Sequence, residues 1–361
     1  MRFAADGGET GDAGLDPDTV VVKIGGAAAV DPAGAVTDVA HLVANGVRVV
    51  VVHGGSTAVD ETLGELGIEP EYVETPDGVT GRFTDAETMR AFTMTLAGEL
   101  NTDLVTQFRE ANVDAVGLSG VDGGLLTGPR TGTVRVVEDG RKKIRRGDHS
   151  GRIASVRTEL LETLLDAGHV PVVTVPMLAT DEGGGARAGD RASAAENEDA
   201  AAGDDGSAGD DGGSTAGDGA TETRDLLPVN TDADRAAASV AGALDAPLVA
   251  LTDVRGVYAD PDNPETLIEH VETGEAFAAL EAAAEGFMTR KVMAAEAALS
   301  AGSPAVVIGD ANVRDPVIAA LGGDGTRVDR AAVVDEAGAG ESSAGESSAD
   351  ETTDESAEVE S

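Results

Sequence analysis

The sequence has no cysteine and no tryptophan, and aromatic residues make up only 2% of its 361 residues. The lack of cysteine excludes disulfides within the chain, thiolate metal sites and a cysteine nucleophile. Hydrophobic residues nevertheless reach 41%, so the core has to be built from Val, Leu, Ile and Ala. The length suits one large domain or two smaller ones.

Long apolar segments are also missing. The sequence holds no run of about 18 apolar residues, which is the length that a membrane-spanning helix needs. Residues 1–17 lack the apolar region of a signal peptide and read as a polar N-terminal arm. These absences predict a soluble, cytoplasmic protein that does not contact a membrane.

Positive charge is scarce. The chain has 67 acidic and 25 basic residues, a net charge of −42, and such a field repels nucleic acid. The composition resembles that of proteins from extreme halophiles. Only four basic residues are lysines, which makes each of them a candidate for a functional role: Lys23, Lys142, Lys143 and Lys291.

Part of the negative charge lies in segments that lack the residues of a core. Asp181–Arg224 has 12 acidic and 3 basic residues, with no Val, Ile, Leu or aromatic side chain. We therefore predict a disordered, acidic, Gly/Ala-rich insertion over residues 179–225. Residues 331–361 read as an acidic disordered tail. The segments 18–178 and 226–330 remain to form the fold.

These two segments alternate between apolar strands and helices. The apolar runs are continuous, as in strands buried on both faces of a parallel sheet, and fall at Thr19–Ile24, Val47–Val52, Ala115–Leu118, Val170–Val175, Leu248–Leu251 and Ala305–Ile308. Helices are predicted at Asp31–Asn45, Thr57–Leu66, Thr84–Ala111, Ser155–Ala167, Asp232–Leu244, Glu275–Ala284 and Met288–Ser300. The alternation predicts an α/β fold, a three-layer αβα sandwich with a mainly parallel central sheet.

Glycine pairs follow the first two predicted strands, where ligands of open α/β sheets bind. After the first strand, Gly25 and Gly26 let the backbone approach a phosphate, and Lys23 supplies positive charge. A plain tight turn is the alternative. After the second strand, His53-Gly54-Gly55-Ser56 offers a second set of backbone amides for an anion. For His53 itself we favour a structural, hydrogen-bonded histidine over a catalytic base.

Charged and amide residues mark four further positions. Arg82 precedes a predicted helix and could pair with a substrate carboxylate or serve as a surface charge. Asn230 or Asp232 could be the N-cap of the helix that contains Asp234. Alternatively, Asn230, Asp232 and Asp234 could together organise a cation, either a lysine ammonium group or Mg²⁺. Asp253 follows a buried strand, at a position that suits a nucleotide or a simple turn. Lys291 is expected in the first turn of its helix, where a cation is unfavourable without an anionic partner.

In this order the motifs resemble the amino acid kinase family, specifically its N-acetylglutamate kinase branch. Within the branch, Arg82–Asp85 and Gly117–Gly123 look like the archaeal and thermophilic kinases that act on glutamate or 2-aminoadipate linked to the carrier protein LysW. The resemblance implies ATP with Mg²⁺ carried mainly by the nucleotide, no metal-binding residues, and a homodimer.

The resemblance also implies roles for individual residues. Lys23 and Lys291 would be the transition-state lysines, and Asp234 would orient them. Substrate contacts would come from Gly55, Ser56, Arg82 and Asn230, and cofactor contacts from Gly25, Gly26 and Asp253. Two positions depart from the family pattern, because Ser56 and Phe287 stand where glycine is usual.

The chemistry is consistent with these roles. A side-chain carboxylate has a pKa of about 4.3 and is already ionised at neutral pH, so it needs no general base to attack a phosphate. Positioning and charge neutralisation carry most of phosphoryl transfer, and two lysines with Mg²⁺ supply both.

Five basic residues within six positions form an exception to the acidic chain: Arg141, Lys142, Lys143, Arg145 and Arg146. They lie in a predicted β-hairpin formed by Thr131–Val137 and Lys142–Ile153. The absence of interleaved aromatic residues argues against RNA. An acidic carrier protein fits better as a docking partner, and a hairpin that balances nearby acids is the alternative.

We therefore expect an ATP-dependent kinase that phosphorylates carrier-linked glutamate or 2-aminoadipate in arginine or lysine biosynthesis. Residues 18–178 would bind the amino acid and residues 226–330 would bind ATP. A kinase of free N-acetylglutamate is the alternative, and a non-catalytic nucleotide or amino-acid sensor is a more distant one.

Overall fold

The computed structural model describes residues 14–26, 31–76, 80–138, 141–180, 226–284 and 286–334. Residues 181–225, most of the N-terminal arm and residues 335–361 lie outside this part, and so do the disorder predictions for them. Ala332 is buried, so the folded chain continues past residue 330, where the tail was predicted to begin.

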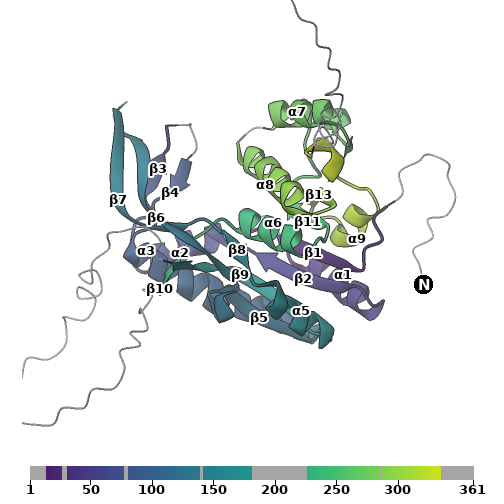
Figure 1. The fold of residues 1–361 in the computed structure, drawn as a ribbon, viewed down its shortest axis with the longest axis horizontal. Helices are drawn as coiled ribbons and strands as arrows, with labels where there is room; N and C mark the ends of the chain where they lie inside the picture. The colour runs from purple at the N-terminus through teal and green to yellow at the C-terminus, as the bar shows by residue number, and fades with distance from the viewer. Residues whose placement is uncertain are drawn as a thin grey trace, which may run out of the picture.

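One large sheet forms the centre of the molecule (Figure 1). Over the described residues its main path runs β12-β14-β13-β11-β1-β2-β9-β6-β7, with β5 and β10 paired to β9 and β8 paired to β6. The pairs β1–β2, β1–β11, β11–β13 and β2–β9 are parallel, whereas β13–β14 and β6–β7 are antiparallel. The predicted mainly parallel sheet is confirmed.

The strands of this sheet are β1 (Thr19–Ile24), β2 (Arg48–His53), β5 (Ala115–Gly120), β6 (Leu126–Glu138), β7 (Arg141–Gly151), β8 (Ser155–Val156), β9 (Val170–Thr180), β10 (Leu226–Val229), β11 (Leu248–Thr252), β12 (His270–Val271), β13 (Ala305–Asp310) and β14 (Thr326–Asp329). A separate two-stranded sheet consists of β3 (Tyr72–Glu74) and β4 (Thr80–Arg82).

The helices are α1 (Ala33–Ala44), α2 (Ser56–Glu65), α3 (Ala86–Phe92), α4 (Asn101–Glu110), α5 (Thr158–Asp166), α6 (Ala233–Ala243), α7 (Gly274–Ala283), α8 (Phe287–Ala301) and α9 (Pro316–Leu321). The predicted helix 84–111 is divided, because a π-helical segment, Thr93–Leu100, joins α3 to α4. Among the described helices, each is too short or too polar to cross a membrane.

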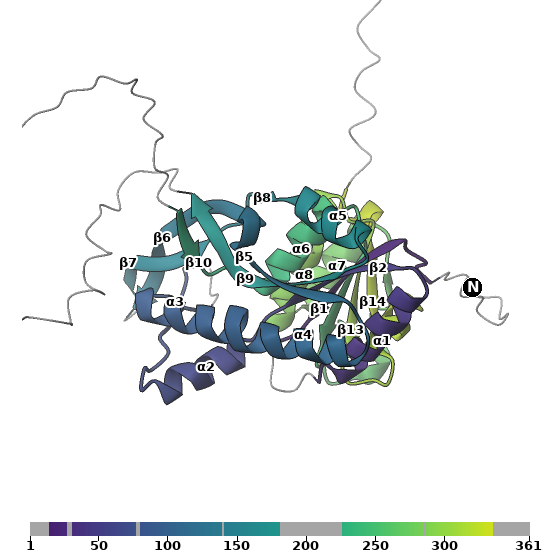
Figure 2. The same cartoon turned by 90° about the horizontal axis from the view of Figure 1, so that it is seen from below.

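Two apolar layers flank the sheet, as the three-layer prediction requires (Figure 2). Helices α1, α4 and α9 pack on one face, and α5, α6 and α8 pack on the other. The alternation along β1 divides its side chains between the two: Val20 and Val22 face the first layer, and Val21 faces the second. Lys23 has the parity of Val21, so its side chain points toward α6 and α8.

Helices α6 and α8 pack closely because small residues line their contact. A Cβ atom at Gly242 of α6 would lie 2.4 Å from Cβ of Ala301 in α8. This contact lies at the C-terminal ends of both helices, and the N-terminal halves of the same two helices carry the charged residues described below.

The two ends of the long insertion lie side by side. Thr180 at the end of β9 is the antiparallel partner of Leu226 at the start of β10. Residues 181–225 therefore leave and re-enter the sheet at neighbouring positions.

Candidate active site

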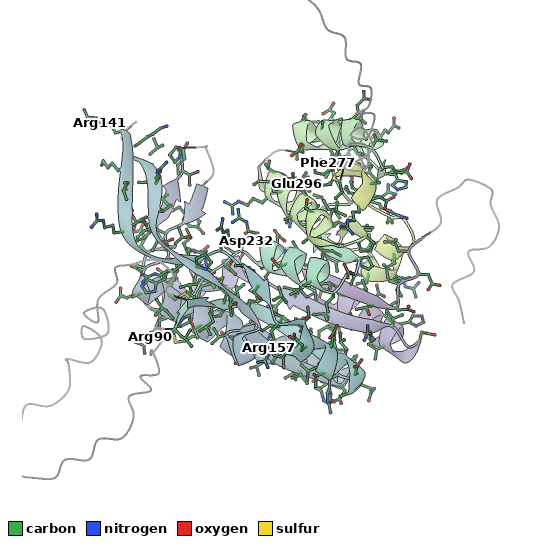
Figure 3. All side chains as sticks on the ribbon, in the orientation of Figure 1. Arg90, Arg141, Arg157, Asp232, Phe277 and Glu296 are labelled. Atoms are coloured by element: carbon green, nitrogen blue, oxygen red, sulfur yellow. The ribbon has the colours of Figure 1, made fainter. Side chains whose placement is uncertain are left out.

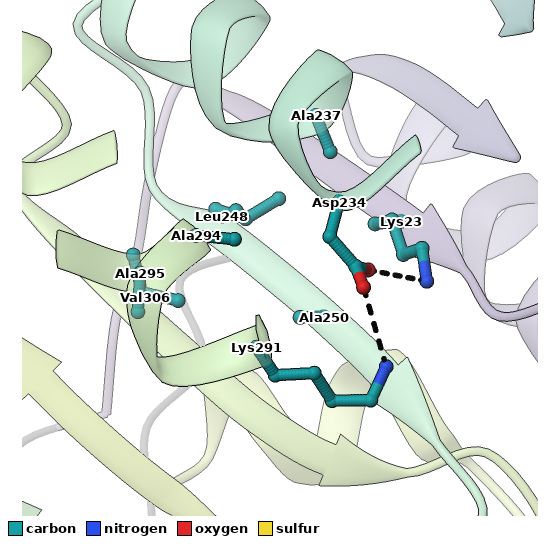
Figure 4. Close-up of a pocket in the computed structure, with 9 residues that line it drawn as sticks. All are labelled: Lys23, Asp234, Ala237, Leu248, Ala250, Lys291, Ala294, Ala295 and Val306. Atoms are coloured by element: carbon teal, nitrogen blue, oxygen red, sulfur yellow. Dashed lines mark ion pairs between the residues drawn. The ribbon is translucent and has the colours of Figure 1, made fainter. Parts of the chain in front are cut away.

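A single carboxylate joins the two predicted catalytic lysines (Figure 4). Asp234 Oδ1 lies 2.5 Å from Nζ of Lys23, and its Oδ2 lies 3.7 Å from Nζ of Lys291. The three side chains come from β1, α6 and α8, and their exposed fractions are 6%, 18% and 14% for Lys23, Asp234 and Lys291. The structure thus brings together the three residues that the sequence analysis expected to act together, and their catalytic role stays a prediction.

The N-cap of α6 is Asp232, so the side chain of Asp234 is not used as a cap and can face the lysines. The Asp232 side chain caps α6 by accepting hydrogen bonds from the backbone N–H of Asp234, at 2.9 Å, and of Arg235, at 3.1 Å. Of the two alternative caps, Asn230 and Asp232, it is therefore Asp232 that caps the helix. The Asp234 side chain, in the first turn, points toward the sheet.

The charges of the site shift its pKa values in directions that have clear causes. Burial raises the pKa of Asp234, but the attraction of Lys23 and Lys291 outweighs it, so the net pKa is lowered. Burial and repulsion by Lys23 lower the pKa of Lys291, and Asp234 opposes this only in part. The carboxylate is thus ionised, and Lys291 is a weaker base than an ordinary lysine.

The position of Lys291 along its helix differs from the prediction. Helix α8 begins at Phe287, which places Lys291 at the start of the second turn rather than in the first. Its need for an anionic partner is met by Asp234, and the carboxylates of Asp232 and Asp253 also act on it electrostatically.

The floor of this site is apolar and made of small side chains. Besides the charged residues, the pocket is lined by Ala237, Leu248, Ala250, Ala294, Ala295 and Val306. An apolar floor strengthens the electrostatic interactions above it.

The two glycine-containing loops touch each other. A Cβ atom at Gly26 would lie 2.2 Å from the backbone nitrogen of Gly55, so only glycine fits there. Gly54 lies close to the start of α6, because a Cβ atom on Gly54 would be 3.2 Å from Cβ of Ala233. The ends of β1 and β2 and the start of α6 therefore converge beside Lys23. His53 hydrogen-bonds with Gly54 O and with Asn101, and burial lowers its pKa, which fits the predicted structural role.

Arg82 and Ser56, both predicted to bind substrate, are in contact. Nη2 of Arg82 donates to the carbonyl oxygen of Ser56 at 3.0 Å and to its hydroxyl at 3.2 Å. Two further partners of Nη2 were not predicted from the sequence: Asp60, at 2.6 Å, and the Tyr72 hydroxyl, at 3.0 Å. Nε of Arg82 is buried without a hydrogen-bond partner among the described residues, so the guanidinium keeps donor capacity.

Asn230 lies at the end of β10, next to the last residues of β7. Its backbone N–H donates to the carbonyl of His149 at 2.7 Å, and its carbonyl accepts from Gly151 at 2.8 Å. Its side-chain oxygen is buried and has no partner within the described chain. Asp253 is exposed at the end of β11, where it accepts a hydrogen bond from the Thr252 hydroxyl at 3.0 Å.

The basic hairpin projects away from the sheet, and Arg141 marks its tip (Figure 3). Arg141, Lys142, Lys143 and Arg146 are exposed as a docking surface requires. Arg145 is different: it is half-buried, lies 2.8 Å from Glu71, and its guanidinium carbon lies 4.9 Å from the centre of the Phe83 ring. Of the five predicted docking residues, Arg145 is therefore engaged within the chain, with Glu71 and Phe83, and its docking role stays a prediction.

Among the described residues, one other cluster has donor types that bind metals. His270 Nε2 lies 2.8 Å from Asp329 and 3.6 Å from Glu272, at the β12–β14 edge of the sheet. The sequence analysis missed it because the residues come from two distant strands. Arg327 neutralises Asp329 at 2.8 Å, so the cluster has the contacts of a surface ion-pair network.

The chain matches the model of the amino acid kinase family over residues 18–198 and 208–310. Together with the lysine–aspartate–lysine site, this match shows that the chain belongs to the amino acid kinase family and is a phosphotransferase. Among curated relatives, LysW-aminoadipate kinase of Deinococcus radiodurans is 35% identical over 310 residues, covering 86% of this chain and 91% of that protein. Acetylglutamate kinase of Methanopyrus kandleri is 35% identical over 290 residues, covering 80% and 93%.

Solved structures share the fold at lower identity. N-acetylglutamate synthase from Neisseria gonorrhoeae matches with a TM-score of 0.58 and 23% identity, over 86% of this chain and 61% of that chain. Our chain thus spans about three fifths of that synthase. Carbamate kinase from Giardia matches with a TM-score of 0.54 and 17% identity, over 88% and 100%.

Proposed function

We propose that the protein is an ATP-dependent kinase that phosphorylates the side-chain carboxylate of glutamate or 2-aminoadipate linked to a LysW-type carrier protein. The product is an acyl phosphate of arginine or lysine biosynthesis. The observation that carries this proposal is Asp234, which holds Lys23 and Lys291 at once. Two ammonium groups against one carboxylate leave an excess positive charge, which fits an anionic phosphoryl group in transfer.

In the proposed reaction, an oxygen of the acceptor carboxylate attacks the γ-phosphorus of ATP. The bond to the β,γ-bridging oxygen breaks, and ADP leaves with its electron pair. The acceptor is ionised at neutral pH, so no proton has to be removed. Lys23 and Lys291 neutralise the charge that gathers on the transferred group and on the leaving oxygen. Mg²⁺ carried by the nucleotide would supply further neutralisation of phosphate charge.

The amino acid is proposed to lie over residues of the 18–178 lobe, with Asn230 as a further contact from the end of β10, beside β7. Arg82 retains unused donors that suit the free carboxylate of the amino acid. The buried side-chain oxygen of Asn230 suits the amide N–H of a blocked amino group. Gly55 and Ser56 complete this side at the start of α2.

ATP is proposed to lie over the 226–330 lobe. Gly25 and Gly26 would pass beneath the phosphates, since the close contact of Gly26 with Gly55 leaves only backbone there. Asp253 would lie at the nucleotide, because it acts electrostatically on Lys291.

The exposed basic residues of the hairpin are proposed to bind the acidic carrier protein. Arg141, Lys142, Lys143 and Arg146 form this docking surface, on a chain whose net charge of −42 would otherwise repel an acidic partner. The relatives named for LysW-linked substrates support a carrier of this kind.

Three further assignments belong to this proposal. The enzyme would act as a homodimer, which sedimentation in KCl would test. It would work in the cytoplasm, where ATP is available. Its acidic composition would be an adaptation to high salt, which thermal unfolding at rising KCl concentration would test.

The decisive experiment measures ADP release with Mg-ATP in molar KCl. It compares carrier-linked glutamate, carrier-linked aminoadipate and free N-acetylglutamate at equal concentration. Turnover confined to the carrier-linked substrates is expected, and the preferred one assigns the pathway. Turnover mainly with free N-acetylglutamate would contradict the carrier-linked substrate and favour an acetylglutamate kinase. The Methanopyrus relative is named for that activity. Absence of turnover with all three would contradict both.

A further inference from the structure

The base of the basic hairpin lies between two segments that bind substrate in the proposed function. The backbone N–H of His149 donates to the carbonyl of Thr84 at 2.6 Å, two residues from Arg82. The carbonyl of the same His149 accepts from the N–H of Asn230 at 2.7 Å. One residue of β7 therefore links the Arg82 segment to the Asn230 segment.

A bulge at this point turns an acidic side chain inward. Between the paired residues Thr133–Arg146 and Thr131–Ser150, β6 has one residue, Gly132, and β7 has three, residues 147–149. Gly147 has a φ of +88°, which glycine adopts readily. Bulges of this kind bend a strand and re-aim the side chains beside them.

The re-aimed side chain is Asp148, which is only 4% exposed. Its Oδ1 accepts a hydrogen bond from the backbone N–H of Thr84 at 3.1 Å, and Ser150 donates to it from both its backbone and its hydroxyl. Arg130 donates to the Asp148 carbonyl at 3.0 Å, and its positive charge attracts the Asp148 carboxylate less strongly than the hydrogen bonds from Thr84 and the Ser150 hydroxyl do. Within the described part of the chain this carboxylate has no ion pair, and a buried carboxylate without one is costly to maintain, which indicates a specific role.

The hairpin holds the same segment at a second point. Arg145 lies over the ring of Phe83, the residue between Arg82 and Thr84, and its ion pair with Glu71 fixes it there. The chain from Arg82 to Thr84 is thus attached to β7 on successive residues.

We infer that Asp148 is a positioning residue for the amino acid substrate: it fixes the Arg82–Thr84 segment at a set distance from Asn230. This inference rests on the proposed function, in which Arg82 and Asn230 contact that substrate. Asp148 itself is buried beneath the segment and acts through Thr84.

The test is the steady-state kinetics of Asp148→Ala and Asp148→Asn with the substrate that the wild type turns over. Loss of a hydrogen bond to a charged group amounts to about tenfold or more in affinity. We expect Asp148→Ala to raise KM for the amino acid substrate about tenfold, with kcat and KM for ATP within about twofold of wild type. Asp148→Asn keeps one acceptor for Thr84, so a smaller rise is expected.

Asp38 provides a matched control. It is also a buried carboxylate, 1% exposed, that accepts two backbone N–H groups, those of Val317 at 2.8 Å and Ile318 at 3.1 Å. It lies between α1 and α9, in the layer opposite α6 and α8. Asp38→Ala should lower the melting temperature as Asp148→Ala does, but leave both KM values unchanged. An equal rise of the amino-acid KM in Asp148→Ala and Asp38→Ala would contradict the positioning role, because Asp148 would then contribute only to stability.

Arg82→Lys separates this inference from the proposed function. If Arg82→Lys leaves KM for the amino acid unchanged, the substrate role of Arg82 in the proposed function is wrong. If Arg82→Lys raises it and the Asp148 variants do not, only the positioning role is wrong. In the Arg82→Lys background, Asp148→Ala should add less than about threefold, because both changes act on the same contact. Should Asp148→Ala fail to fold, the same comparison with Asp148→Asn decides.

Discussion

Nζ of Lys23 lies 2.5 Å from Oδ1 of Asp234, where the first strand ends and the helix that follows the insertion begins. Parallel strands end at the same edge of the sheet, so residues far apart in the sequence meet there. Lys291 completes the group from α8, and the opposing charges of Asp234 make the burial of both ammonium groups tolerable.

Replacing either lysine should reduce the chemical step more than binding. We expect Lys23→Ala or Lys291→Ala to lower kcat by about 10²–10³, as for the loss of one preorganised stabilising group. ADP release at saturating substrates measures the effect. Unchanged kcat in both variants would remove the basis of the mechanism.

The lowered pKa of Lys291 should set an alkaline limit to activity. Burial and Lys23 favour the neutral amine, so Lys291 loses its proton below the ordinary lysine value of 10.5. The protonated form is required, hence kcat should fall as pH rises through this lowered pKa. In Lys291→Arg the remaining activity should persist to higher pH, since arginine stays charged. A kcat–pH profile of both proteins measures this, and identical alkaline limbs would contradict the assignment.

Charge reversal on the hairpin should weaken carrier binding alone. Lys142→Glu combined with Lys143→Glu is expected to raise KM for the carrier-linked substrate about tenfold, at the lowest salt that keeps the protein folded. The rise should shrink in molar KCl, where the Debye length is about 3 Å, and KM for ATP should not change.

The control for that experiment is Arg314→Glu combined with Arg330→Glu, which changes the net charge equally on the exposed surface away from the hairpin. Equal effects of the two double variants on KM would mean that the overall charge of the protein, and not the hairpin surface, determines how strongly the carrier binds.

The contact between the two glycine loops should be intolerant of a methyl group. Gly26→Ala places Cβ 2.2 Å from the Gly55 nitrogen, so the loops must separate beside Lys23. A displacement of about 1 Å costs about 10² in rate, and we expect kcat to fall by at least that factor. Gly64→Ala in α2 is the control, because its Cβ meets nothing within 4 Å. It should leave kcat unchanged and stabilise α2 by about 0.5–1 kcal/mol, measured by thermal unfolding.

The fold was predictable where the sequence pattern has one physical cause. Strands such as β1 and β2 are runs of valine buried on both faces, so their bounds were predicted to within one residue. The short strands β8 and β12, of two residues each, show no period and were missed. The π-helical turn at Thr93–Leu100 was missed because apolar spacing does not distinguish the two hydrogen-bond patterns.

The residues of the site also fall into those that the sequence predicts and those that it does not. Lys23, Asp234 and Lys291 stand in recognisable motifs, so their order along the chain was enough to group them. Asp60 and Asp148 gain their partners only through tertiary contacts, with Arg82 and Thr84. The one sequence signal for Asp148 was an acid at the end of a basic run.

The Tyr72 hydroxyl donates a hydrogen bond of 2.7 Å to Asp60, which holds a natural fluorophore at this position. The chain has no tryptophan and two tyrosines, so its tyrosine emission, which is stronger than that of phenylalanine, arises from Tyr72 and Tyr258. Tyr72 lies beside Arg82, and Tyr258 follows β11 in the other lobe. Tyr258→Phe would therefore leave one native fluorophore at the proposed amino-acid site, and titration of its emission could follow ligand binding without any attached dye.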